Sequence, residues 1–123
     1  MPRNKDLSAY TALVTGASSG IGLEYARQLA AQGANLVMVS IDREDLDREA
    51  KKIVDISGVS VETICMDLAQ PDAANKLYYH CRQKGIQIEI LINNAGIFSF
   101  QEITRTDPKT VSYTHLRAHE TLM

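Results

Sequence analysis

The sequence predicts an α/β fold built on a doubly wound parallel sheet with helices on both faces. Two observations predict this fold: apolar strand patterns alternate with helical patterns, and a glycine-rich run, Thr15–Gly22, joins the first strand to the first helix. Alternation of this kind implies parallel strands covered on both faces. Right-handed crossovers limit the possible arrangements of such strands. We expect the strand order 3-2-1-4, which places the first two helices on one face and the third on the other, with the sheet truncated after the fourth strand.

Four apolar segments are expected to form the strands. They span residues 10–15, 35–41, 59–66 and 88–92. Their content of valine, isoleucine and leucine is typical of strands that are buried in a sheet.

Two helices are predicted from the first half of the chain. Residues 20–32 carry an apolar stripe, and Gly33 is expected to end that helix. Residues 43–57 carry a second stripe, which Asp42 can cap and Gly58 can end.

A third helix is predicted between the third and fourth strands. Pro71 suits a first helical position, and Gly85 is expected to end the helix. Its apolar positions follow the helical spacing i, i+3, i+4, i+7: Ala74, Leu77, Tyr78 and Cys81.

Composition limits the functional class. The 123 residues suffice for one domain, and the net charge of −2 gives no indication of a nucleic-acid or anionic-membrane partner. The beginning of the chain lacks an apolar signal region, and no apolar run reaches the length of a membrane span. Cys65 and Cys81 have no metal-binding or redox spacing. We therefore expect a cytoplasmic protein without a metal.

The glycine-rich run predicts a phosphate-binding turn. Backbone N–H groups in the first helical turn have no partner within the helix, and the helix dipole places partial positive charge there. Glycines let the backbone approach a ligand closely. A P-loop would need a lysine, but Ile21 stands five residues after Gly16 and no lysine follows. A methyltransferase also has a glycine loop, but it gives no account of Asn93-Asn94-Ala95-Gly96. The pattern thus favours the pyrophosphate of a nucleotide cofactor.

Three short motifs end predicted strands and carry a family resemblance. They are Thr15-Gly-x-x-x-Gly-x-Gly22, Asp67-Leu68 and Asn93-Asn-Ala-Gly96. From residue 8 to about 110 the chain resembles the short-chain dehydrogenase/reductase family. The resemblance implies a Rossmann-type fold and an NAD(P)-dependent oxidoreductase that transfers hydride between the nicotinamide and an alcohol or carbonyl substrate.

The same resemblance implies which residues bind the cofactor. Those at the pyrophosphate are Gly16, Gly20, Ile21 and Gly22, with Ser18 and Ser19 near the phosphate on the adenosine side. Asp67 and Leu68 are expected to flank the adenine. The residues expected at the adenosine ribose are Asn94, Ala95 and Gly96.

The end of the second predicted strand bears on the choice between NAD and NADP. Asp42 can accept a hydrogen bond from a ribose 2′-hydroxyl. A 2′-phosphate about 5 Å away would be repelled by about 3 kcal/mol per unit charge at an effective dielectric constant near 20. Many NADP-dependent relatives have an arginine where this chain has Ile41, although Arg43 can turn inward and reverse the preference. We expect NAD, with NADP left open, and Asp42 can equally be a helix cap alone.

The last residues resemble a translated sequencing adapter. This resemblance covers residues 111–121, so we predict that residues 1–110 are the amino-terminal part of a dinucleotide-binding domain and that residues 111–123 are a non-native tail. His115 and His119 imitate a zinc-binding helix without an evident third ligand. Tyr113-x-x-x-Arg117 imitates the family's Tyr-x-x-x-Lys, but it comes too soon for another strand to precede it.

No catalytic residue is identified in the chain. The resemblance implies a serine, an asparagine and a Tyr-x-x-x-Lys motif, and none of them maps onto residues 1–110. His80 is expected on a helix surface, away from the site. We therefore expect no dehydrogenase activity from this chain alone. The alternative is a non-catalytic NAD(P)-binding sensor or regulator with the same fold. A full-length protein is expected to be a homo-oligomer that acts on a small molecule.

Truncation has an expected physical cost. The fourth strand would become an open sheet edge, and one face of the sheet would keep only the third helix. We therefore expect the chain to aggregate or to remain partly unfolded.

Overall fold

The computed structural model describes residues 6–94 and a short strand at residues 112–115. Within these residues, parallel strands form one sheet in the order β3-β2-β1-β4-β5. The strands are β1 Thr11–Thr15, β2 Asn35–Ser40, β3 Val61–Cys65, β4 Ile90–Asn93 and β5 Ser112–His115. The helices are α1 Gly20–Ala31, α2 Arg43–Ser57 and α3 Ala73–Gln83. The predicted α/β class and the order 3-2-1-4 are confirmed.

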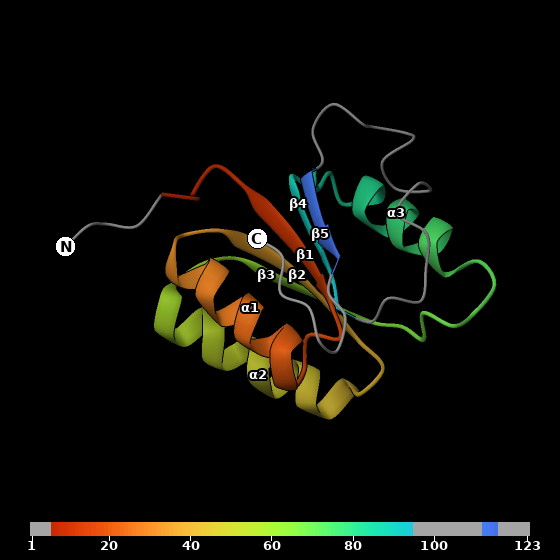
Figure 1. Cartoon of the computed structure of the whole chain (residues 1–123), viewed down its shortest axis with the longest axis horizontal. Coiled ribbons are helices and arrows are strands. Elements are labelled where there is room, and N and C mark those ends of the chain that lie inside the picture. The colour runs from red at the N-terminus through yellow and green to blue at the C-terminus, as the bar shows by residue number, and fades with distance from the viewer. Residues whose placement is uncertain (1–5, 95–111, 116–123) are drawn as a thin grey trace.

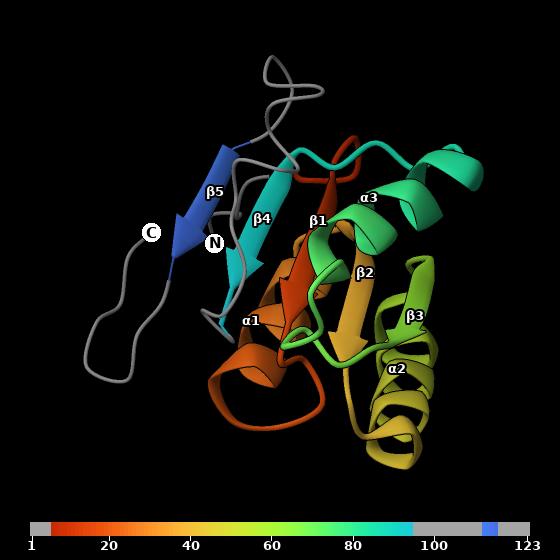
Figure 2. The same ribbon diagram turned by 90° about the vertical axis from the view of Figure 1, so that its right-hand side faces the viewer.

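The helices lie in two layers, one on each side of the sheet. Figure 1 shows α1 and α2 together on one face and α3 on the other, and Figure 2 shows the strands running in one direction between them. Successive strand residues point to opposite faces. Val14 therefore belongs to the core beneath α1 and α2, whereas Leu13 belongs to the core beneath α3. Each face of the sheet thus has its own apolar core.

Helix α2 agrees with the sequence prediction at both ends. It spans Arg43–Ser57, and the side chain of Asp42 accepts a hydrogen bond from the Asp45 N–H at 3.2 Å. Gly58 follows the helix with φ of 74° in the left-handed region, where a side chain is strained. The cap and the stop signal act locally, which is why the sequence predicts them well.

The predicted start of the third helix at Pro71 is wrong. Helix α3 begins at Ala73, after Asp72. Two successive turns precede it, since the Gln70 N–H donates to the Asp67 carbonyl at 3.2 Å and the Ala73 N–H donates to the Gln70 carbonyl at 3.1 Å. These turns place Pro71 in the connection from β3, where its fixed φ suits a turn as well as a helix start.

The fourth strand begins later than the sequence predicts. Residues 88–92 were expected, whereas β4 spans Ile90–Asn93. The Glu89 N–H donates to the Thr11 carbonyl at 3.0 Å, but the Thr11 N–H donates to the Glu89 side-chain oxygen at 2.7 Å. A carboxylate thus takes the place of a backbone acceptor at the beginning of the β1–β4 pair.

The expectation of a sheet truncated after the fourth strand, with an open edge there, is also wrong. Strand β5 pairs with β4 in parallel, from Ile90 opposite Ser112 to Asn93 opposite His115. A strand therefore forms within the segment that was expected to be a tail, and it contains Tyr113. The segment's non-native origin stays a prediction. His115 lies on strand β5, so the helical i, i+4 spacing from His115 to His119 does not apply. His119 itself lies outside the described residues.

The apolar face beneath α3 is also better covered than expected. The strand residues at its centre are at most 1% exposed: Leu13, Val37 and Leu91. The exposed apolar surface expected on this face is therefore not found at these positions. Aggregation of the chain stays a prediction, but the open edge and the exposed face no longer support it.

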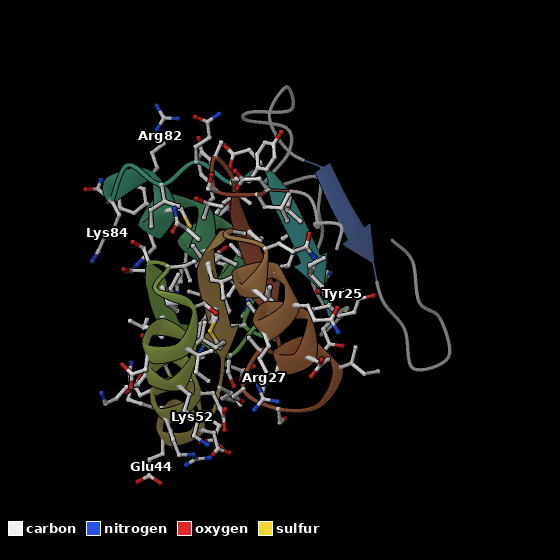
Figure 3. The ribbon with its side chains drawn as sticks, turned by 90° about the vertical axis from the view of Figure 1, so that its left-hand side faces the viewer. Tyr25, Arg27, Glu44, Lys52, Arg82 and Lys84 are labelled. Carbon is white, nitrogen blue, oxygen red and sulfur yellow. The ribbon has the colours of Figure 1, made fainter. Side chains whose placement is uncertain are left out.

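A group of charged residues joins α3 to β3. His80 Nε2 lies 2.7 Å from Glu62 Oε2, and Lys84 Nζ lies 3.2 Å from the same oxygen. The hydrogen bond from His80 is the main cause that holds the pKa of the Glu62 carboxyl below its ordinary value, and Lys84 adds to it. Figure 3 shows Lys84 at the opposite end of the molecule from Glu44, which lies at the start of α2. His80 thus supports the fold, away from the carboxyl ends of the strands.

We predict that Glu62→Gln destabilises the fold at neutral pH by about 1 kcal/mol. A carboxyl with a lowered pKa in the folded state stabilises it above the unfolded pKa, and the effect disappears as pH falls through the folded pKa. Urea unfolding at neutral and acidic pH measures this difference. Glu24→Gln, at an exposed position of α1 beyond its first turn, is the control. A Glu62→Gln effect that stays constant down to the lowest pH would contradict the ion-pair account.

Candidate functional site

The connection from β1 to α1 is a tight turn anchored to the sheet. Gly16 has φ of 62° and Gly20 has φ of 58°, both in the left-handed region that favours glycine. Between them, the Ala17 N–H donates to the Val39 carbonyl at 3.0 Å. This hydrogen bond ties the turn to β2, so the position of the turn is set by the sheet.

Gly22 lies where no side chain fits. A Cβ atom at this position would stand 2.1 Å from the carbonyl oxygen of Gly16 and 3.0 Å from Asn94 Nδ2. Both distances are shorter than ordinary van der Waals contact. Helix α1 can therefore approach the end of β1 only because Gly22 has no side chain.

The first turn of α1 is free of acidic side chains and of side-chain capping. Ser19 is the N-cap residue, its side chain makes no capping hydrogen bond, and no Asp or Glu lies in the first turn. The Leu23 N–H donates to the Ser19 carbonyl at 3.2 Å, which is the first hydrogen bond of the helix. The N–H groups that precede Leu23 are therefore free of helical partners, and the helix dipole makes this end positive.

Polar side chains join the ends of β1 and β4. Thr15 Oγ1 donates to Asn93 Oδ1 at 3.1 Å, and both residues are fully buried. Asn94 Nδ2 donates to the Gly16 carbonyl at 3.4 Å. Helix α1 leaves β1 on one face and α3 leads to β4 from the other, so the winding reverses between these strands. Doubly wound folds bind ligands at such a reversal.

A chain of hydroxyl groups connects the glycine turn to the end of β2. Ser18 Oγ and Ser40 Oγ lie 2.8 Å apart, and Ser40 Oγ accepts the Asp42 N–H at 3.1 Å. Ser40 is 8% exposed, whereas the next residue, Ile41, is 68% exposed. Asp42 is the cap of α2, as one of its two interpretations from the sequence held, and the residue is exposed.

The end of β3 contributes a turn and a core residue. Asp67 Oδ1 accepts the Ala69 N–H at 2.9 Å, so this carboxylate shapes the turn. Leu68 is expected to face the adenine through its backbone N–H, and its side chain is 7% exposed and packs in the core beneath α3 with Leu77. Only its backbone N–H, which makes no backbone hydrogen bond in residues 6–94, is left for the expected role.

The structure brings most of the predicted cofactor-binding residues to the carboxyl ends of the strands. The residues of the glycine turn, Asp42 and Asp67 follow β1, β2 and β3, and Asn94 follows β4. Ala95 and Gly96 lie outside the described residues. Sequence reasoning missed Ser40 as a partner of Ser18. The one available signal was a hydroxyl residue that ends an otherwise apolar strand.

The other described residues form weaker candidates for a binding or catalytic site than the carboxyl ends of the strands do. A cavity of about 360 Å³ lies at the amino ends of β1 and β2, but its two carboxylates, Glu62 and Glu89, already have protein partners. Burial raises the pKa of the Cys81 thiol to about 11, so this thiol stays protonated at neutral pH. Residues 6–94 contain no group of three potential metal ligands, and none of their helices has the length and apolarity of a membrane span.

Comparison with known proteins identifies the family. A family model described as short chain dehydrogenase matches residues 10–117. The chain belongs to the short-chain dehydrogenase family. This assignment confirms the resemblance drawn from the three strand-end motifs and the Rossmann-type fold that it implies.

This chain spans only between 26% and 37% of the length of the three short-chain dehydrogenases compared below. The chain is 42% identical over 87 residues to a very-long-chain 3-oxoacyl-CoA reductase of Schizosaccharomyces pombe, covering 71% of this chain and 26% of that protein. It is 45% identical to a short-chain dehydrogenase from Sphingobium yanoikuyae solved with NADPH, with a TM-score of 0.64, covering 71% of this chain and 34% of that one. An L-sorbose reductase from Gluconobacter frateurii, solved with NADPH and L-sorbose, is 33% identical with a TM-score of 0.71, covering 79% of this chain and 37% of that one.

We predict that Gly22→Ala destabilises the short-chain dehydrogenase fold by at least about 2 kcal/mol, because its Cβ would overlap a backbone oxygen that cannot move independently of β1. Gly85→Ala is the matched control, since Gly85 has φ of 70° but open space around it. Its cost should be about 1 kcal/mol of backbone strain. Chemical denaturation measures both values, and equal losses would show that the close approach at Gly22 is unimportant.

Proposed function

We propose that this chain is the cofactor-binding part of an NAD(P)-dependent oxidoreductase that transfers hydride between the nicotinamide and a small alcohol or carbonyl compound. The observation that carries the proposal is the glycine turn at the start of α1, which lies beside the end of β4 at the point where the winding reverses. The family assignment and the NADPH complexes among its relatives support the same role.

The pyrophosphate is proposed to bind at the first turn of α1. The N–H groups of Gly20, Ile21 and Gly22 precede the first hydrogen bond of the helix and can donate to phosphate oxygens. No acidic side chain of the first turn opposes the phosphate charge. The positive φ angles of Gly16 and Gly20 shape the turn that leads from β1 into this first helical turn.

The adenosine end is proposed to accept NADP, although the sequence alone favoured NAD. Asp42 supports NAD through its negative charge, but one of its oxygens is engaged by the Asp45 N–H and the residue is exposed, where solvent screens the charge. The relatives from Sphingobium yanoikuyae and Gluconobacter frateurii were solved with NADPH. These relatives and the hydroxyl pair of Ser18 and Ser40 support NADP.

A carbonyl compound is the proposed substrate class. The Schizosaccharomyces pombe relative is a 3-oxoacyl-CoA reductase and the Gluconobacter frateurii relative is a sorbose reductase, so both are named for the reduction of a substrate. In this family the cofactor, when bound, supplies or accepts the hydride. The described residues of this chain bind and orient the adenosine and pyrophosphate half of that cofactor.

A non-catalytic NAD(P)-binding protein is the second candidate. The described residues support binding and not proton transfer: they carry the phosphate-binding turn, and none of the five tyrosines of the given sequence is followed by a lysine four residues later, so the full-length sequence decides between the two candidates. The phenol of a catalytic tyrosine needs a lowered pKa to act at neutral pH, and a nearby lysine provides it. The tyrosines are Tyr10, Tyr25, Tyr78, Tyr79 and Tyr113.

We predict that Ser19→Asp abolishes binding of NADPH and leaves the fold intact. Aspartate is a good N-cap residue and stabilises a helix start, so α1 should be at least as stable. Its charge would occupy the place proposed for the pyrophosphate and repel it. Fluorescence titration with NADPH measures the affinity, and thermal unfolding measures the fold.

Gln87→Glu is the matched control for added charge. Gln87 is exposed and lies before β4, near the amino ends of the strands, so a new charge there should leave NADPH binding unchanged. If Ser19→Asp and the unmodified chain bind NADPH equally well, the phosphate does not sit at the start of α1 and the proposed function fails.

We also predict that this chain alone does not oxidise NADPH in the presence of aldehydes and ketones. It has no Tyr-x-x-x-Lys motif, so a bound carbonyl would lack its proton donor. The absorbance of reduced nicotinamide, followed with purified chain and a panel of carbonyl compounds, tests this. Turnover that scales with chain concentration and is lost in Ser19→Asp would contradict the prediction.

A further inference from the structure

Ser40 has an unusual place among the polar residues at the carboxyl ends of the strands. It is the last residue of β2, it is 8% exposed, and its hydroxyl contacts two different loops. On one side it accepts the Asp42 N–H at 3.1 Å, and on the other it lies 2.8 Å from the hydroxyl of Ser18. A buried hydroxyl with these partners links the glycine turn to the start of α2.

The two contacts allow Ser18 to act as a hydrogen-bond donor to a ligand. Ser40 Oγ accepts the Asp42 N–H, and within the serine pair either hydroxyl can donate to the other. When Ser40 is the donor, Ser18 accepts this hydrogen bond and keeps its own proton for a further acceptor. The hydrogen bonds then run in one direction, from the Asp42 N–H through Ser40 to Ser18, and bonds in such a chain strengthen one another.

Ser18 is placed to donate to a ligand. It is partly exposed, it lies within the glycine turn, and its contact with Ser40 brings it to the end of β2. In doubly wound dinucleotide-binding folds the end of the second strand faces the adenosine ribose. Ser18 Oγ therefore lies on the side of the site where the ribose 2′ position is expected.

We propose that Ser40 is a positioning residue for cofactor selectivity, which holds the Ser18 hydroxyl so that its proton is donated to a 2′-phosphate oxygen of NADP. The inference rests on the proposed function, since it requires a dinucleotide at this site. A phosphate gains more from this donor than a 2′-hydroxyl does, because hydrogen bonds to a charged acceptor are about twice as strong as neutral ones.

The charges around Ser40 make such a device useful. Ile41 offers no positive charge, and the exposed Arg43 pairs with Asp47 at 3.7 Å across one turn of α2. Asp42 adds a negative charge nearby. With no cation fixed at the end of β2 in the described residues, an oriented hydroxyl donor is a means of favouring the phosphate.

The test compares two ligands that differ only by the 2′-phosphate, adenosine 2′,5′-bisphosphate and adenosine 5′-monophosphate. Both are expected to occupy the adenosine half of the site, so neither needs a nicotinamide pocket. Their affinities for the whole chain are measured by ligand-observed NMR titration. We expect Ser40→Ala to weaken the bisphosphate about fivefold and to change the monophosphate less than about twofold.

Three further variants separate positioning from a general structural effect. Ser40→Thr keeps the hydroxyl and should restore the bisphosphate affinity. Ser18→Ala should lose at least as much as Ser40→Ala, and the double variant should lose no more than Ser18→Ala, because Ser40 acts through Ser18. Ser60→Ala, at an exposed position before β3, is the control and should change neither affinity.

Each other outcome overturns the inference. An equal loss for both ligands in Ser40→Ala would mean that Ser40 only supports the loops. Additive losses in the double variant would mean that the two serines act separately. Either result would leave the proposed function standing. If the unmodified chain binds neither ligand at millimolar concentration, the inference and the proposed function fail together.

Discussion

The approach of Gly22 to the carbonyl group of Gly16 controls the position of α1, and most of the site depends on it. A side chain at position 22 would meet that oxygen at 2.1 Å. The helix therefore starts directly above the end of β1, and its free N–H groups lie at the carboxyl edge of the sheet. A helix displaced outward by one side-chain layer would have the same dipole but would no longer point it at the reversal between β1 and β4.

The rest of the site is held by polar contacts between neighbouring strand ends. Thr15 and Asn93 join β1 to β4 in the interior, while Ser18 and Ser40 join the glycine turn to β2. Buried polar residues are costly unless they are hydrogen-bonded, so these pairs also fix the relative positions of the loops. The site is thus built on the sheet, and its loops have little freedom to separate before a cofactor arrives.

The sequence predicted well those features that depend on local signals. Asp42 and Gly58 gave both ends of α2, and the glycine pattern gave the start of α1. It failed where distant residues decide. The pairing of β5 with β4 and the contact between Ser18 and Ser40 involve segments far apart in the chain, which no local pattern records.

The most direct test of the account is a ¹H–¹⁵N NMR titration of the chain with NADPH, in which every backbone amide is a separate probe. The account predicts saturable shifts that are largest for the amides of residues 19–22, because these N–H groups would gain phosphate acceptors. Amides at the amino ends of the strands should stay unchanged. Saturable binding with its largest shifts at that opposite end, or no shift at residues 19–22 at millimolar NADPH, would contradict the account.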